Sequence, residues 1–180
     1  MPIQQEKTQQ RDTNFMLTID EMRRSLRKQY AVTAGQDGEE YAEAWLKKAG
    51  WEFEPIEQGT TSMPQKLKAY GGKRPDFIVK ADDSTCILLD AKYHSTDNCS
   101  TFTLTDSELG KYTALHTFIS SIFPNCKFEV VFMLFPKEED GKKFTFISLE
   151  EFENGKNAIL NSKNATQISI TNRDDLWFNC

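Results

Sequence analysis

The sequence predicts an α/β fold in which helices cover a mixed central sheet. Helical and strand-like patterns follow one another in the order α, α, β, β, β, α, β, β, α. Residues 86–89 are apolar at consecutive positions, which is typical of a strand buried on both faces. The chain has 180 residues, of which 38% are hydrophobic, so we expect a single folded domain over residues 15–180.

Each predicted helix begins at a capping box, in which Ser, Thr or Asp precedes Glu by three positions. The first box predicts an accessory helix over residues 19–32, after a polar lead of residues 1–14 that we expect to be disordered. Gly50 ends the second helix. The four boxes begin at Thr18, Asp37, Thr105 and Ser148.

The strands are predicted from apolar and alternating runs bounded by turn residues. Residues 81–84 are polar and predict a hairpin between the second and third strands. Residues 57–74 are basic and contain Gly and Pro, so we expect a long functional loop there. The predicted strands are 51–56, 76–80, 85–93, 127–135 and 143–147.

Composition excludes some classes of protein. No apolar run could span a bilayer and the start lacks a signal-peptide pattern, so we expect a cytoplasmic protein that does not enter membranes. The four cysteines are scattered without a C-x-x-C pair, which predicts free thiols. The net charge of -5 argues against tight binding of nucleic acid through phosphate neutralisation alone, but not against an acidic site whose bound cations offset the charge.

Three charged residues on the predicted hairpin form a candidate metal site. Asp90 and Lys92 project from the same face of their strand because side chains alternate, and Ala91 projects from the other. Asp76 begins the neighbouring strand, so the hairpin can bring its carboxylate towards that of Asp90. Two adjacent carboxylates raise one another's pKa unless a cation lies between them, and hard oxygen ligands suit Mg²⁺ or Mn²⁺.

A structural interpretation of the same residues stays open. Asp76 can be a turn residue after Pro75, and Asp90 can form a structural ion pair with Lys92. The spacing alone is a weak signal, since it arises by chance in several per cent of chains of this length. Placing charges at the end of a buried strand is costly unless they are paired or bind a metal, so the context favours a site.

Glu39 is the acidic residue of the second helix that is best placed to reach the sheet. At about 100° per residue, it lies about 70° from the centre of the apolar stripe, whereas Glu40 is nearly opposite. A favourable charge at the helix N-terminus is an equally good explanation of Glu39. The stripe consists of Ala42, Trp45, Leu46 and Ala49.

Together these residues resemble the PD-(D/E)xK nuclease superfamily, which has a restriction-endonuclease-like fold with an αβββαβ core. The resemblance covers roughly residues 37–148. The helix from Gly38 to Leu46 is similar to that of Holliday-junction resolvases. The segments Gly71 to Asp76 and Asp90 to Tyr93 are similar to type IIS restriction cleavage domains and to the nuclease subunit of modification-dependent restriction systems.

The resemblance implies a metal-dependent endonuclease. Asp76, Asp90 and the backbone carbonyl of Ala91 are expected to hold one or two Mg²⁺ or Mn²⁺ ions, with Glu39 as a ligand of the second ion. Lys92 is expected to orient or deprotonate the attacking water. Candidate nucleic-acid contacts are Lys73, Arg74 and Lys111.

The expected substrate is DNA, and the expected setting is a defence, toxin or mobile-element system. Cleavage of both strands would call for a homodimer, and a partner subunit or immunity protein is a further expectation. Two alternatives remain: an RNA endonuclease of the same fold, and a module that binds nucleic acid or assembles with proteins without cleaving.

Overall fold

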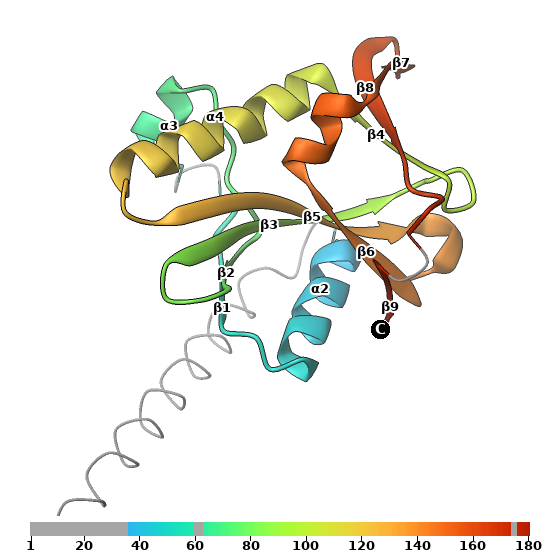
Figure 1. The fold of residues 1–180 in the computed structure, drawn as a ribbon, viewed down its shortest axis with the longest axis horizontal. Helices are drawn as coiled ribbons and strands as arrows, with labels where there is room; N and C mark the ends of the chain where they lie inside the picture. Colours follow the sequence, from blue (N-terminus) through green and yellow to red (C-terminus); the bar gives the residue numbers. More distant parts are fainter. Residues whose placement is uncertain (1–35, 60–62, 174–175) are drawn as a thin grey trace, which may run out of the picture. The chain divides into compact units, whose positions relative to one another are not determined.

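Two sheets organise the computed structural model, which describes residues 36–59, 63–173 and 176–180 (Figure 1). The larger sheet is mixed, because β3 and β5 are parallel and its other neighbouring strands are antiparallel. Its spatial order is β1 (Phe53–Pro55), β2 (Phe77–Lys80), β3 (Thr85–His94), β5 (Lys127–Pro136), β6 (Lys143–Ser148) and β9 (Trp177–Asn179).

The smaller sheet is antiparallel and packs beside the long helix. It contains β4 (Thr101–Thr105), β8 (Lys163–Ser169) and β7 (Lys156–Leu160), in that order. All described residues belong to the compact unit Gly35–Cys180. The predicted lead over residues 1–14 and the predicted helix over residues 19–32 lie outside the described residues.

Two helices cover opposite faces of the larger sheet (Figure 1). α4 (Asp106–Ile122) packs Tyr112 and Leu115 against one face, and α2 (Gln36–Lys48) packs Ala42 and Leu46 against the other. Successive residues of β3 point to opposite faces, so Leu88 joins the core under α4 while Leu89 joins the core under α2. The prediction that this strand is central and buried on both faces is confirmed.

The predicted α/β class and the hairpin of β2 and β3 are confirmed, as are the strands β1, β5 and β6. The Thr105 cap of α4 is also present, since the Thr105 side chain accepts a hydrogen bond from the amide of Glu108. The apolar stripe of α2 is one residue shorter than predicted, because Ala49 lies beyond the helix and is exposed.

Several predictions are wrong in detail. The basic loop over residues 57–74 contains the helix α3 (Gln65–Ala69), which is too short to show helical periodicity in the sequence. Ser148 and Glu151 form the predicted capping box, but the helix that follows is a 3-10 helix, η2 (Leu149–Asn154), and not an α-helix. A second 3-10 helix is η1 (Lys137–Glu139).

The sequence interpretation also missed four strands, β4, β7, β8 and β9. Strand β4 has a clear alternation of Thr with Phe102 and Leu104, a signal that was present. β7 and β8 are largely polar and are joined at Asn161 and Ser162, whose φ angles are 50° and 62°. That backbone is typical of a tight two-residue hairpin, but Asn-Ser is a weaker sequence signal than Asn-Gly.

Among the described residues, no helix is long and apolar enough to cross a membrane. All four cysteines are free thiols, as predicted.

Candidate active site

The centre of the candidate site is a buried carboxylate held by two ammonium groups. Asp90 and Lys92 project from the same face of β3 and are only 2% and 8% exposed. Lys92 Nζ lies 2.9 Å from Asp90 Oδ2, and Lys73 Nζ lies 3.0 Å from Asp90 Oδ1. The predicted pairing of Asp90 with Lys92 is therefore present, and Lys73 adds a second cation from the segment that precedes β2.

Asp76 immediately precedes β2, the strand that pairs with β3. Its amide donates to the carbonyl of Leu89 at 3.0 Å, and its Oδ2 accepts from the amide of Ala91 at 2.7 Å. Burial raises the pKa of the Asp76 carboxyl to about 8, with further contributions from the negative charges of Asp90 and Glu39. The hairpin thus brings Asp76 close to Asp90, as its spacing in the sequence predicts.

Glu39 reaches this cluster from α2. Its side chain is half-buried, and its pKa is raised by burial and then by the charge of Asp90, while Lys73 lowers it. Glu40 is exposed, in agreement with the predicted helical phase. A Cβ atom at Gly38 would lie 3.3 Å from Cβ of Tyr93, so the absence of a side chain there allows α2 to approach β3 closely.

Two residues of α4 complete the cluster, and the sequence interpretation did not assign them to it. Glu108 Oε1 accepts from Lys92 Nζ at 2.6 Å, and the hydroxyl of Tyr112 accepts from Lys73 Nζ at 2.7 Å. The centroid of the Tyr112 ring also lies 4.6 Å from Lys73 Nζ and 5.2 Å from Lys92 Nζ. Glu108 and Tyr112 are four positions apart on a helix, which is the signal that could have placed them on one face.

The surroundings of Lys92 keep its ammonium group charged. Burial lowers the pKa of Lys92, but the carboxylates of Asp90 and Glu108 outweigh burial and raise it overall. The pKa of the Tyr112 phenol is raised by burial and by Asp90, so its hydroxyl stays protonated. Lys92 is therefore arranged to orient a polar group or to stabilise a negative charge.

The donor atoms of this cluster suit a hard divalent cation. With every group ionised, four carboxylates and two ammonium groups leave a net charge of -2, which one divalent ion would neutralise. Asp90 Oδ1 is buried and makes no hydrogen bond of normal geometry with the described residues, although Lys73 Nζ is near it. The charged groups are Glu39, Asp76, Asp90, Glu108, Lys73 and Lys92.

The carboxylates do not yet surround a common point. Among the described residues, no three Asp, Glu, His or Cys side chains are grouped closely enough to hold an ion. Lys73 Nζ instead contacts Asp90. The Lys73 side chain is partly exposed, with 32% of its surface accessible. The carboxylate oxygens suit a divalent cation by their chemistry, but the described residues do not group them as ligands of one ion, and the Lys73 ammonium group lies beside Asp90 Oδ1.

The predicted nucleic-acid contacts have different positions. Lys73 belongs to the cluster itself. Arg74 donates from a terminal guanidinium nitrogen to the carbonyl of Gly59 at 2.9 Å, and Lys111 is exposed on α4, one position before Tyr112. The structure thus brings together Glu39, Asp76, Asp90, Lys92 and Lys73, whereas Lys111 lies on the adjoining surface.

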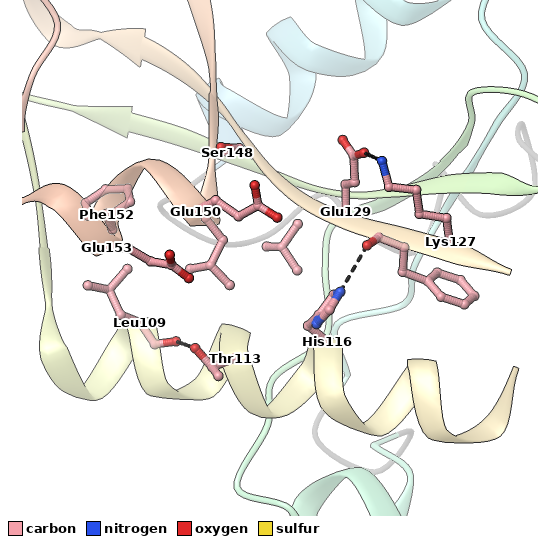
Figure 2. Close-up of a pocket in the computed structure, with 12 residues that line it drawn as sticks. Leu109, Thr113, His116, Lys127, Glu129, Ser148, Glu150, Phe152 and Glu153 are labelled. Atoms are coloured by element: carbon pink, nitrogen blue, oxygen red, sulfur yellow. Dashed lines mark hydrogen bonds and ion pairs between the residues drawn. The ribbon is translucent and has the colours of Figure 1, made fainter. Parts of the chain in front are cut away.

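A separate cavity of about 520 Å³ lies between α4, β5 and η2 (Figure 2). His116 lines it and its Nε2 lies 3.0 Å from the carbonyl oxygen of Phe128. The lining includes none of the predicted site residues. The cavity is therefore distinct from the carboxylate cluster.

The chain matches no protein-family model, and no curated protein matches it significantly.

Proposed function

We propose that this chain is a divalent-metal-dependent endonuclease of the restriction-endonuclease-like fold that hydrolyses phosphodiester bonds of DNA. The observation that carries the proposal is the convergence of Glu39, Asp76, Asp90 and Lys92 from one helix and one hairpin. Buried charges are costly, and a divalent cation would neutralise the net charge of -2 that the cluster carries when Asp76 is ionised.

The order of the elements supports this fold assignment. α2, β1, β2, β3, α4 and β5 follow one another in the αβββαβ order of the superfamily, and β5 pairs in parallel with β3. The helix α3 and the strand β4 are additions to that order. This order of elements and this pairing support the proposed fold for residues 37–148.

The proposed roles follow from position and charge. Asp76, Asp90, Glu39 and the Ala91 carbonyl would hold one or two Mg²⁺ or Mn²⁺ ions. When bound, such an ion polarises a phosphodiester and lowers the pKa of a bound water. Lys92 orients the attacking water and stabilises negative charge on the phosphate, because its raised pKa disfavours a role as a proton acceptor.

Glu108 is a positioning residue in this proposal. Its 2.6 Å contact with Lys92 holds the ammonium group in addition to the 2.9 Å contact with Asp90. Lys73, by contrast, occupies Asp90 Oδ1 and would release it when a cation binds. Lys92 and Lys73 thus have different proposed roles, because Lys92 is held by two carboxylates whereas Lys73 is partly exposed.

An RNA endonuclease and a non-catalytic module are the competing functions. Purified protein should be incubated with plasmid, single-stranded DNA and RNA, each with Mg²⁺, Mn²⁺ or a chelator. We expect metal-dependent cleavage of DNA that is absent with chelator and absent in the Asp90→Asn variant. Cleavage of RNA alone would select the first alternative, and intact substrates with every metal would select the second.

A further inference from the structure

A basic segment that contains α3 leads into the candidate site at Lys73. Residues 58–75 contain four cations and no Asp or Glu, in a chain whose net charge is -5. One of the four, Lys73, contacts Asp90. Lys66 and Lys68 lie exposed on α3, and no ion pair joins them to a residue that the structure describes.

An exposed aromatic ring lies at the end of the same short helix. Tyr70 follows α3 and is 51% exposed, and the centroid of its ring is 5.4 Å from that of Phe118 on α4. The chain is tightly packed at Gly72, two residues after Tyr70. A Cβ atom at Gly72 would lie 2.5 Å from a methyl carbon of Leu67 and 3.2 Å from the amide nitrogen of Leu115. Tyr70 is therefore presented to solvent from a close-packed base.

Lys111 connects this ring to the candidate site. It is exposed and precedes Phe118 by seven residues, which is about two helical turns, so both residues lie on one line of α4 about 10 Å apart. Lys111 also directly precedes Tyr112, whose hydroxyl contacts Lys73. Lys66 and Tyr70 are four positions apart and so lie on one side of the short helix α3, whereas Lys68 lies on the other. We call the exposed residues Lys66, Tyr70 and Lys111 the basic–aromatic strip.

We propose that the basic–aromatic strip binds an unpaired strand of nucleic acid, with Tyr70 stacking on a base and the lysines contacting phosphates. A combination of cations and an exposed ring is typical of single-strand binding, because a base exposes its face only when it is unpaired. The phosphates of a duplex would be contacted by the lysines alone and would leave Tyr70 without a partner.

The inference rests on the proposed function only in that the strip leads to the carboxylate cluster at Lys73. It assigns to that site a substrate with a single-stranded segment, such as an overhang, a flap or a gap.

Binding should be measured with a fluorescent single-stranded oligonucleotide of roughly 12 nucleotides and a duplex of equal length, in a chelator that prevents cleavage. We expect the single strand to bind at least about tenfold more tightly than the duplex. Tyr70→Ala should weaken single-strand binding about tenfold, and Tyr70→Phe should bind as the wild type does. Trp51→Ala is the matched control, since Trp51 is 40% exposed and follows α2, which covers the opposite face of the sheet.

Salt dependence tests the lysines independently of Tyr70. Replacing Lys66 and Lys111 together with Gln should reduce the magnitude of the slope of log K against log salt by about 1.4, since each phosphate contact with a single strand contributes about 0.7. Lys48 and Lys142 are exposed on other elements, and replacing them together with Gln should leave the slope unchanged.

Equal affinity for duplex and single strand, or wild-type affinity in Tyr70→Ala, would refute the proposal that the basic–aromatic strip binds an unpaired strand. These measurements contain no free metal and require no cleavage, so they do not depend on the catalytic assignment. Single-strand binding without any cleavage would contradict the nuclease proposal alone. Metal-dependent cleavage, together with unaltered single-strand binding in Tyr70→Ala, would contradict only the proposed role of the strip.

Discussion

Asp76 and Asp90 are buried carboxylates on neighbouring strands, but the protein surrounds them differently. Asp90 has an ammonium group near each of its oxygen atoms, from Lys73 and Lys92. Asp76 receives a backbone hydrogen bond from Ala91, and its pKa is raised to about 8 by burial and by neighbouring negative charge. The protein itself offsets the charge of Asp90, whereas Asp76 depends on a proton or a cation.

The largest expected effect is on cleavage. Asp90→Asn and Lys92→Ala should each lower the single-turnover rate by about a thousandfold, because each removes a group that acts in the transition state. Asp83→Asn is the control, since that side chain is fully exposed in the turn between β2 and β3. Wild-type rates in either site variant, with contaminating nuclease excluded, would refute the assignment.

A second effect should appear in the stability of the metal-free protein. Asp90→Asn leaves Lys73 and Lys92 without their shared carboxylate. It should therefore lower the free energy of unfolding by roughly 2–4 kcal/mol. The lower end of this range is favoured because Lys73 is partly exposed. Asp76→Asn removes no ammonium partner and should be at least as stable as the wild type. Urea unfolding in chelator at pH 8 measures the free energy of unfolding of both variants. Equal losses of this free energy would show that the two aspartates contribute alike to stability.

Glu39 should sharpen the comparison, because its charge contributes to the raised pKa of Asp76. Glu39→Gln should reduce cleavage about thirtyfold, through loss of a metal ligand. Glu40→Gln is the matched control, since Glu40 is the exposed neighbour on α2 and should retain activity. A reversed result, with only Glu40→Gln inactive, would mean that the helix presents the other face to the site.

The smallest effect concerns pH. The pKa of Asp76 is raised on folding, so between about pH 4 and pH 8 the native state holds a proton that the unfolded state has lost, and stability falls as pH rises through this range. The metal-free wild type should therefore lose stability relative to Asp76→Asn between pH 5 and pH 8, by about 1 kcal/mol or more. Parallel stability curves for the two proteins would show that Asp76 titrates normally.

Metal should act on the same carboxylate. Millimolar Mn²⁺ should raise the melting temperature of the wild type at pH 8, because an ion that binds only the native state stabilises it by mass action. The shift should be largely lost in Asp76→Asn. An identical shift in both proteins would indicate that the ion binds elsewhere.

The sequence could predict the part of the site that depends on local periodicity. Alternation along a strand placed Asp90 and Lys92 on one face, and the helical phase of the apolar residues selected Glu39 over Glu40. The hairpin turn at residues 81–84 then brought Asp76 alongside. Each of these relations is fixed within a few residues of the chain.

The remaining parts depend on long-range packing. Glu108 was interpreted only as a member of a capping box, and its contact with Lys92 requires α4 to pack over β3. The Lys73 contact with Asp90 likewise depends on how the preceding segment folds back. α3 and the β7–β8 hairpin are too short or too polar for their patterns to stand out.

The parallel pairing of β3 with β5 also bears on the order of folding. The β2–β3 hairpin closes across four residues, whereas β3 and β5 pair only after the chain between residues 95 and 126 has crossed over as α4. Local contacts form faster than contacts that close long loops. Asp76 and Asp90 are thus expected to meet early in folding, together with Lys92 of the same hairpin, so that completion of the crossover adds the further carboxylate of Glu108 to charges that are already close together.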